Sequence, residues 1–487
     1  MKSLTKLLCL LLAGVMLLGM LASCNKDKGD GEGDTTASNN GDEGNGLVFD
    51  ENGYLMDSLP ETYDWNTNYT IYSWSNMQAW EWCPELTNKA SAVDRTLWER
   101  QNHVEERFGV TLKFVFERGE WDNRNKFIEK LSASVMLNQG TYDLVDQAVV
   151  AAGIGAVQEL YVDLNDMNYL DLTKPWWPAT INETAAVGPN LYFVTGDVTA
   201  TFIRNVNCAS VNLDMYDSYN IKDLANGKSI FQLVDDYEWT IGKMYELGLG
   251  KVNTENGEYG IALKNNVTAD LFFYGAGFRC VRAVDGEMSM SDDLSSPILM
   301  DFFDKVQELY AGRYPDAGIT GIDVFKQKKA LFYMGGLADC SQFTEEGVNF
   351  TVVPAPLLNE DSQSYHSIHN TYLSMFSIPK DGKDMDMSAM ILEALGSYGY
   401  RVVTDEIYYD LFQYRYNGVN QDTARMFDLV SDSTTYDVAR LFVDDIGMFS
   451  DFRNTVNDPA GNWNTVYNQE KEGWENGLEY LKLKIGK

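Results

Sequence analysis

The alternation of strand-like and helix-like segments is the feature that most constrains the fold of this chain. Residues 69–74 (YTIYSW) and 110–116 (VTLKFVF) are rich in the β-branched and aromatic residues that favour extended backbone. Between them, apolar residues recur at helical spacing over 92–108, and Gly109 follows as a helix-ending glycine. This order predicts the start of an α/β domain with a mainly parallel sheet.

The same alternation continues further along the chain. The next expected elements are a helix over 121–138, a strand over 142–145, a strand over 205–212, a helix over 235–249, a helix over 298–310, strands over 331–334 and 349–354, and a mostly helical region from residue 388. A chain of 487 residues has room for two or three folding units.

The N-terminus has the pattern of an export signal. Lys2 and Lys6 flank the start of an apolar run over 7–21, which is too short and too early for a membrane-spanning helix. The run ends in LASC, so Cys24 resembles the lipid-modified cysteine of a bacterial lipobox. We expect residues 1–23 to be a lipoprotein signal peptide; an ordinary secretory signal with an incidental cysteine is the alternative.

A polar stretch follows the proposed lipid site. Residues 25–46 contain no Leu, Ile, Val or aromatic residue, so they cannot bury apolar surface. Their glycines and polar residues favour a flexible chain, and we place the lipidated Cys24 and a disordered tether over 24–62. We expect the protein outside the cytoplasm, anchored to the cell membrane by its lipid, with no further membrane span.

The chain is strongly acidic, with 72 Asp and Glu against 38 Lys and Arg and a formal net charge of −34. This charge argues against nucleic acid and anionic lipid surfaces as partners. Solubility is the plain interpretation, and a cation-binding role is the alternative. The remaining cysteines are widely spaced without a CxxC pair, so we expect buried thiols, with a disulfide left open. They are Cys83, Cys208, Cys280 and Cys340.

Common enzyme signatures are missing: there is no Walker A loop, full GxGxxG, HExxH or GxSxG. His366 and His369 have a possible ligand spacing, but the chain has 3 His and no dense Cys/His cluster. We therefore expect no metal, no cofactor and no enzyme activity. A glycosidase needs only two well-placed carboxylates, so a cell-tethered glycoside-acting enzyme stays as the alternative.

The order and spacing of several short segments resemble the family 1 extracellular solute-binding proteins of bacterial ABC importers, especially the lipoproteins of clostridia-like bacteria. The resemblance covers nearly all of the mature chain, although the family's usual Asn-Lys pair is replaced at 211–213. The segments are VTLKFVF at 110–116, GTYDLV at 140–145, LDLTKPWW at 170–177, LYFVTGD at 191–197, EWT at 238–240, VNFTVVPAP at 348–356 and SIPK at 377–380.

This resemblance implies an α/β, two-lobed, periplasmic-binding-protein-like (type II) clamp with discontinuous lobes and a hinge. The first lobe would comprise 63–192 and 355–415, and the second 195–352 and 416–487. The resemblance also implies a monomer that holds a small solute, expected to be an oligosaccharide, in the interlobe cleft. It would deliver the solute to ABC permease subunits; a solute-sensing lipoprotein is a further alternative.

Candidate ligand contacts follow the expected strand ends in the first lobe. Trp74, Asn76 and Trp80 come just after the first strand, where indole rings can stack on sugars and amides can bind hydroxyls. Loop packing by these tryptophans is the alternative. Asp146 and Gln147 directly follow the third strand, where the family has a ligand-contacting loop; helix capping by Asp146 is the alternative.

Further candidates come from the first crossover and the second lobe. Asp197 lies at the crossover and can accept hydroxyl hydrogen bonds, while a turn-stabilising role is equally compatible. Phe273 and Tyr274 occupy a position where the family has aromatic contacts. Gly335 and Gly336 would permit close approach of a ligand to the backbone.

Overall fold

The computed structural model describes residues 47–486 with several gaps; the gaps are 89, 250–251, 253, 266–267, 285–286, 312–319 and 409–420. The predicted signal peptide, the predicted lipid site Cys24 and residues 25–46 of the predicted tether lie outside the described residues. Residues 48–487 group as one compact unit. Within the described residues, no helix combines the length and the apolar character that a membrane crossing requires.

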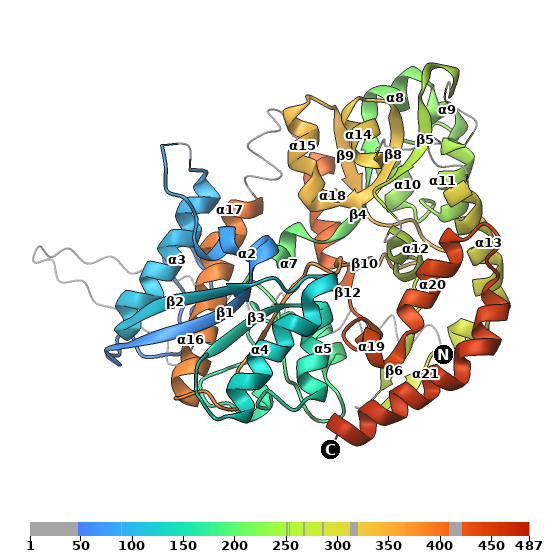
Figure 1. Ribbon diagram of the computed structural model, residues 1–487. Helices are drawn as coiled ribbons and strands as arrows, with labels where there is room; N and C mark the ends of the chain where they lie inside the picture. The colour runs from blue at the N-terminus through green and yellow to red at the C-terminus, as the bar shows by residue number, and fades with distance from the viewer. Residues whose placement is uncertain are drawn as a thin grey trace, which may run out of the picture. The chain divides into compact units, whose positions relative to one another are not determined.

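The first lobe is built on a sheet with the strand order β11-β3-β1-β2 (Figure 1). β1 pairs in parallel with β2 and β3, and β11 pairs with β3 in the antiparallel direction. All five residues of β3 are buried, as expected for a strand covered on both faces. The strands are β1 (Thr67–Trp74), β2 (Val110–Glu117), β3 (Leu144–Ala148) and β11 (Ser374–Ser377).

Helices cover both faces of this sheet, with α4 and α5 on one face and α3 and α16 on the other (Figure 1). α3 has strong local end signals: Ser91 and Asp94 form a reciprocal capping box, and Gly109 ends the helix with φ 60°. The first-lobe helices are α2 (Ser75–Trp82), α3 (Ala92–Phe108), α4 (Arg124–Met136), α5 (Val149–Val157), α6 (Ala179–Ala185), α16 (Met385–Tyr398) and α17 (Thr404–Tyr408).

The second lobe is built on a mixed sheet with the order β5-β8-β4-β9 (Figure 1). β5 and β8 are parallel, whereas β4 runs antiparallel to both β8 and β9. The strands are β4 (Asn207–Asn212), β5 (Tyr259–Leu263), β8 (Ala330–Gly336) and β9 (Phe350–Val353). A separate hairpin consists of β6 (Val281–Val284) and β7 (Glu287–Met290).

Helices of 4 to 15 residues surround the second sheet, and several begin with side-chain caps. The Thr240 hydroxyl, for example, accepts a hydrogen bond from Lys243 N–H at the start of α11. The helices are α8 (Leu213–Ser218), α9 (Ile221–Leu224), α10 (Ile230–Asp235), α11 (Ile241–Gly248), α12 (Ala269–Gly275), α13 (Pro297–Ala311), α14 (Gly321–Lys326), α15 (Cys340–Glu345) and α18 (Gln421–Asp432).

The chain crosses between the two sheets through α7 (Ala200–Arg204), after Val194 has paired with Phe376 at the edge of the first sheet. It returns through residues 354–373, which lead from β9 to β11. This second segment contains β10 (Ser367–Ile368), which pairs with β12 (Thr434–Thr435). Both sheets are therefore made of segments far apart in the chain. The residue boundaries predicted for the lobes stay a prediction.

The last helix, α21 (Trp463–Ile485), touches elements of both lobes. Near its start, the Trp463 indole N–H donates to the carbonyl of Leu294, 2.9 Å away. At its end, the Ile485 carbonyl accepts from Asn190 Nδ2 at 3.0 Å and from the Tyr192 hydroxyl at 3.1 Å. The shorter helices α19 (Val443–Ile446) and α20 (Met448–Asn457) precede it.

Part of residues 48–62 makes defined contacts with the first lobe, although the sequence places this segment in the predicted tether. Asp57 is buried and pairs with Arg107 of α3, with a distance of 2.6 Å between Oδ1 and Nη2. Phe49 and Leu55 form an antiparallel bridge. The tether prediction over 24–62 therefore extends too far, because Asp57 and its neighbours find partners on the first lobe.

Candidate ligand-binding cleft

A cavity of about 560 Å³ opens where the ends of the two sheets meet. Small-molecule sites typically occupy about 300–1,000 Å³, so this cavity fits a small solute. Its walls come from α2, from the first crossover around α7, from the second crossover and from the second lobe. They are Trp80, Ala200, Thr201, Arg204, Asn205, Lys264, Ala338, Asp339, Ser341, Gln342, Asn370 and Tyr372.

A smaller cavity of about 70 Å³ adjoins the first and shares Lys264, Asn370 and Tyr372 with it. Its other lining residues are Asn207, Asn265, Thr268, Gly335 and Thr371. β1 leads into α2 at the cavity, and β5 and β8 end beside it. Ligands of α/β proteins bind at such carboxyl ends of parallel strands.

Trp80 forms one wall of the larger cavity and is 38% exposed. Its indole N–H donates to Oδ1 of Asp94 at 2.7 Å, which fixes the ring orientation. The guanidinium of Arg204 lies 5.3 Å from the centre of the ring. Burial opposes ionisation of Asp94, but hydrogen bonds from Ser91 and Trp80 hold its pKa below the ordinary value.

Tyr372 forms a second aromatic wall and is 42% exposed. Its backbone is held in place by two asparagines: Asn370 Oδ1 accepts from Tyr372 N–H at 2.8 Å, and Asn205 Nδ2 donates to the Tyr372 carbonyl at 2.7 Å. The buried Trp74 ring stacks 6.0 Å away, and its indole N–H donates to Ser374. Trp74 thus supports the cleft wall from behind.

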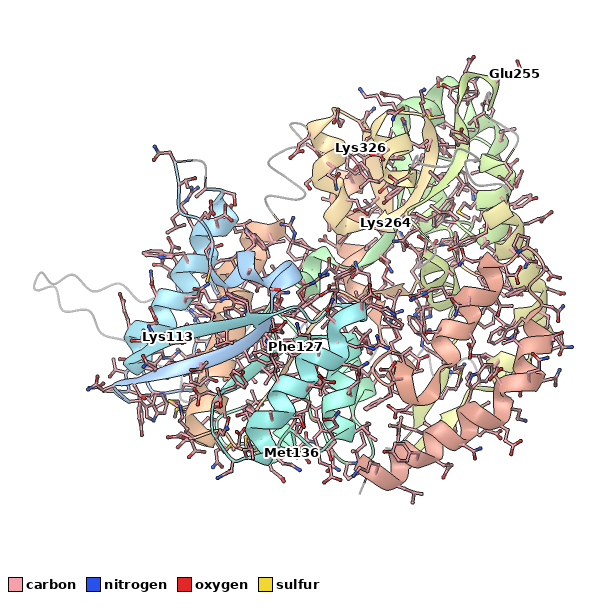
Figure 2. All side chains as sticks on the ribbon, in the orientation of Figure 1. Lys113, Phe127, Met136, Glu255, Lys264 and Lys326 are labelled. Atoms are coloured by element: carbon pink, nitrogen blue, oxygen red, sulfur yellow. The ribbon has the colours of Figure 1, made fainter. Side chains whose placement is uncertain are left out.

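A Lys264–Asp339 ion pair lies on the second-lobe side of both cavities; Figure 2 labels Lys264 just after β5. Lys264 Nζ is 2.8 Å and 2.9 Å from the two carboxylate oxygens of Asp339. Asp339 also accepts from the Tyr333 hydroxyl at 2.9 Å and from Gly336 N–H at 3.1 Å. These partners hold the carboxylate against the end of β8.

The helix that carries Trp80 is tied to the first crossover by a buried ion pair. Glu81 pairs with Arg100 of α3, and its two oxygens also accept from Ala200 N–H at 3.0 Å and from the Thr199 hydroxyl at 2.9 Å. Arg100 in turn donates to the Val198 carbonyl at 2.7 Å. Burial raises the pKa of Glu81, and the charge of Arg100 opposes part of that rise. The cleft wall and the crossover are therefore fixed to each other.

Two residues that the sequence singles out, Trp80 and Gly335, line the cavities. A Cβ at Gly335 would lie 2.2 Å from the Tyr333 ring, so packing within β8 also requires a glycine there. Gly336 is the last residue of β8, and its N–H donates to Asp339. Asn76 lies within α2.

Asp146 and Gln147 are in the interior of the first lobe, not on a cavity wall. They belong to β3 itself, which begins and ends later than the strand predicted over 142–145. Asp146 Oδ2 accepts from Ser73 at 2.8 Å and from the Trp82 indole at 2.7 Å, and burial raises the pKa of Asp146 to about 7. Gln147 is bonded to the Ser377 and Tyr161 hydroxyls.

The other candidates are also partnered inside the protein. Asp197 accepts from the Thr404 hydroxyl at 2.6 Å, and burial raises the pKa of its carboxyl to about 7. Phe273 and Tyr274 are buried in α12, where Phe273 packs against Phe452. The structure thus places these three side chains away from the lining of the two cavities.

Several cavity-lining residues were not expected from the sequence, among them Arg204, Lys264 and Tyr372. They come from the end of a short helix, a strand end and a crossover segment. None of these positions forms a motif with its neighbours in sequence. Asp339 had a usable signal, because it lies three residues after Gly336, the second of the two candidate glycines.

No protein-family model matches the chain, and no curated protein matches it by sequence. Solved structures do match. The galacto-N-biose-/lacto-N-biose I-binding protein of the ABC transporter from Bifidobacterium longum, in complex with lacto-N-biose, gives a TM-score of 0.54 at 12% identity. That match covers 87% of this chain and 99% of the other.

Two further solved structures give similar values. A cyclo/maltodextrin-binding protein complexed with maltotetraose has a TM-score of 0.53 at 12% identity, over 85% of this chain and 97% of the other. An ABC substrate-binding protein from Listeria monocytogenes, in complex with cycloalternan, has a TM-score of 0.52 at 12% identity, over 86% and 99%. At this level of identity the likeness concerns the fold. The chain has the α/β, two-lobed, periplasmic-binding-protein-like (type II) fold that the sequence predicts.

Proposed function

We propose that this protein captures a carbohydrate in the cleft and delivers it to an ABC importer from the outer side of the cell membrane. The observation that carries the proposal is the pair of exposed aromatic side chains, Trp80 and Tyr372, in a cavity otherwise rich in amides and hydroxyls. Aromatic rings offer apolar faces to sugar rings, and amides and hydroxyls can satisfy sugar hydroxyls.

Three observations support binding over turnover. The cavity is bounded by both lobes and both described crossovers, so closure about the hinge would enclose a ligand. Among its described lining residues, Asp339 is the sole carboxylate, whereas glycoside hydrolysis commonly uses two. The three solved structures described above are binding proteins, each in complex with an oligosaccharide.

Thermal unfolding against a panel of mono- and oligosaccharides, peptides and polyamines tests the proposal. A carbohydrate at about 100 times its Kd should stabilise the protein by about 2.7 kcal/mol, which is visible as a raised Tm. Trp80→Ala and Tyr372→Ala should each lower the affinity about tenfold or more, since each removes a stacking face. Trp98→Ala is the matched control, because Trp98 is 46% exposed but lies outside both cavities.

Stabilisation by peptides or polyamines alone would keep the clamp and discard the carbohydrate. Conversion of a sugar into products during the assay would instead favour the glycoside-acting enzyme. No stabilisation by any compound in the panel would contradict carbohydrate capture.

The lipid anchor is part of the same proposal and is supported by the LASC sequence that ends at Cys24. Cys24→Ser removes the thiol that would carry the lipid. The variant should move from the membrane fraction to the soluble extracytoplasmic fraction, measured by detergent phase partitioning and immunoblotting. Retention of the variant in the membrane fraction would contradict lipidation at Cys24.

A further inference from the structure

The charges of the cavity differ in sign from those of the chain as a whole. The chain has 72 acidic against 38 basic residues. The described lining of the larger cavity instead contains two cations, Arg204 and Lys264, and one acid, Asp339. A cleft with this charge attracts and orients a ligand that brings negative charge of its own.

The acid of the lining is largely covered by its partners. The Asp339 side chain is only 5% exposed, whereas that of Lys264 is 35% exposed. The Asp339 oxygens already accept from Tyr333, from Gly336 N–H and from Lys264. The pair therefore presents its ammonium group to the cleft and keeps its carboxylate behind.

Arg204, at the end of α7, has a similar arrangement. Its guanidinium lies over the Trp80 ring, and Trp80 donates to Asp94 behind it. The positive charge of Arg204 acts on Asp94 and contributes to lowering the pKa of that carboxyl. Arg204 lines the cavity and Asp94 does not. In both groups, the cation is thus the more accessible member for a ligand in the cavity.

We propose that the cleft selects a carbohydrate that carries an acidic group, such as a uronate, and that Lys264 and Arg204 bind this group. Charge-assisted hydrogen bonds from an ammonium or guanidinium to a carboxylate are about twice as strong as neutral ones. This inference rests on the proposed capture of a carbohydrate and names its class.

The test is isothermal titration calorimetry of the purified protein with fragments of oligogalacturonate, alginate and hyaluronan. Each fragment is paired with its carboxyl-reduced, neutral counterpart. At least one acidic fragment should bind about tenfold or more tightly than its neutral counterpart, and its affinity should fall as salt is added. Lys264→Gln should remove most of that preference, whereas Lys264→Arg should retain it.

Lys228→Gln is the matched control, because Lys228 is 29% exposed and paired with Asp236 and Glu238, outside both cavities. Asp339→Asn is an independent test. It removes the negative charge that pairs with Lys264, so it should raise the affinity for the acidic fragment. Two results would contradict a preference for acidic carbohydrates but leave carbohydrate capture intact. One is that neutral sugars bind as tightly as acidic ones. The other is that Lys264→Gln lowers the affinity for acidic and neutral fragments equally. Binding of neither set would overturn both.

Discussion

At the scale of single residues, Asp146 shows how burial keeps an ionisable side chain out of the cleft in which the sequence placed it. Its carboxyl is fully enclosed, and Oδ2 accepts from Ser73 and Trp82. Burial raises the pKa of this carboxyl from 3.8 to about 7. The folded protein therefore holds a proton that the unfolded chain has released over most of this pH range.

The sign of the effect follows from proton binding. A folded state that binds the extra proton gains stability below the folded pKa, and this gain is lost as the pH rises through about 7. As the pH rises from 5 to 8, the ionisation of Asp146 should lower the free energy of unfolding by about 3 kcal/mol. Asp146→Asn should remove this part of the decline, measured by urea unfolding at both pH values.

Asp361→Asn, which removes an exposed carboxylate, is the control for this prediction. Parallel pH profiles for the wild type and Asp146→Asn would show that Asp146 does not hold the extra proton.

At the scale of elements, the side chains at the start of α3 both cap the helix and orient Trp80 at the cavity wall. Ser91 and Asp94 cap the helix, and the same Asp94 also accepts from the Trp80 indole at the cavity wall. Ser91→Ala should lower the free energy of unfolding by about 1 kcal/mol and leave carbohydrate affinity unchanged. Asp94→Ala should lower both, because Trp80 loses the bond that orients it.

Unfolding and titration calorimetry on the same samples separate the two effects. Asp94→Asn should recover much of the affinity, since its side-chain oxygen can still accept from Trp80. Equal affinities in Ser91→Ala and Asp94→Ala would mean that Asp94 does not orient the indole.

Elements with local end signals could be predicted from the sequence, and elements defined by tertiary contacts could not. α3 begins and ends where the helical spacing of its apolar residues and Gly109 predict, and β1, β2, β4, β9 and α13 are found within two residues of their expected bounds. β3 is buried on both faces, so it lacks the alternation that marks strand ends, and Asp146 and Gln147 were consequently placed after it. The segment after β1 was predicted as a loop but forms α2, whose buried Trp82 bonds to Asp146.

The cleft was predicted less completely than the fold. Trp80 and Gly335 were identified because each stands near the end of a strand with a visible pattern. Arg204, Lys264 and Tyr372 come from three separate parts of the chain and meet only after both crossovers have formed. Residues that are so far apart in the chain show no motif in a single sequence.

At the scale of the whole molecule, α21 is a connection between the lobes in addition to the crossovers. Its end is held to the first lobe by Asn190 and Tyr192, both of which donate to the Ile485 carbonyl. Combining Asn190→Ala with Tyr192→Phe removes both donors. The distribution of distances between the lobes should then broaden in the ligand-free protein, because one restraint on lobe motion is lost.

Spin labels at Lys113 of β2 and at Glu255 of the second lobe, both labelled in Figure 2, would report this distance by electron–electron double resonance. The exposed Cys83 must first be replaced by Ser, whereas the other described cysteines are buried. Lys482→Ala is the control, since Lys482 pairs with Glu479 within α21. Equal distributions in all three proteins would show that the end of α21 does not restrain the lobes.

The strands of the second sheet lie between β3 and β11 in the chain. This order also determines which sheet can be completed first during synthesis. All four strands of the second sheet lie between residues 207 and 353, whereas β11 of the first sheet comes only at Ser374–Ser377. The ribosome therefore synthesises every strand of the second sheet before it synthesises β11, the last strand of the first sheet. Until then β3 has an unpaired edge, and an unpaired edge is a site for mispairing. A chain with this strand order avoids mispairing at β3 if it remains unfolded until its synthesis is complete.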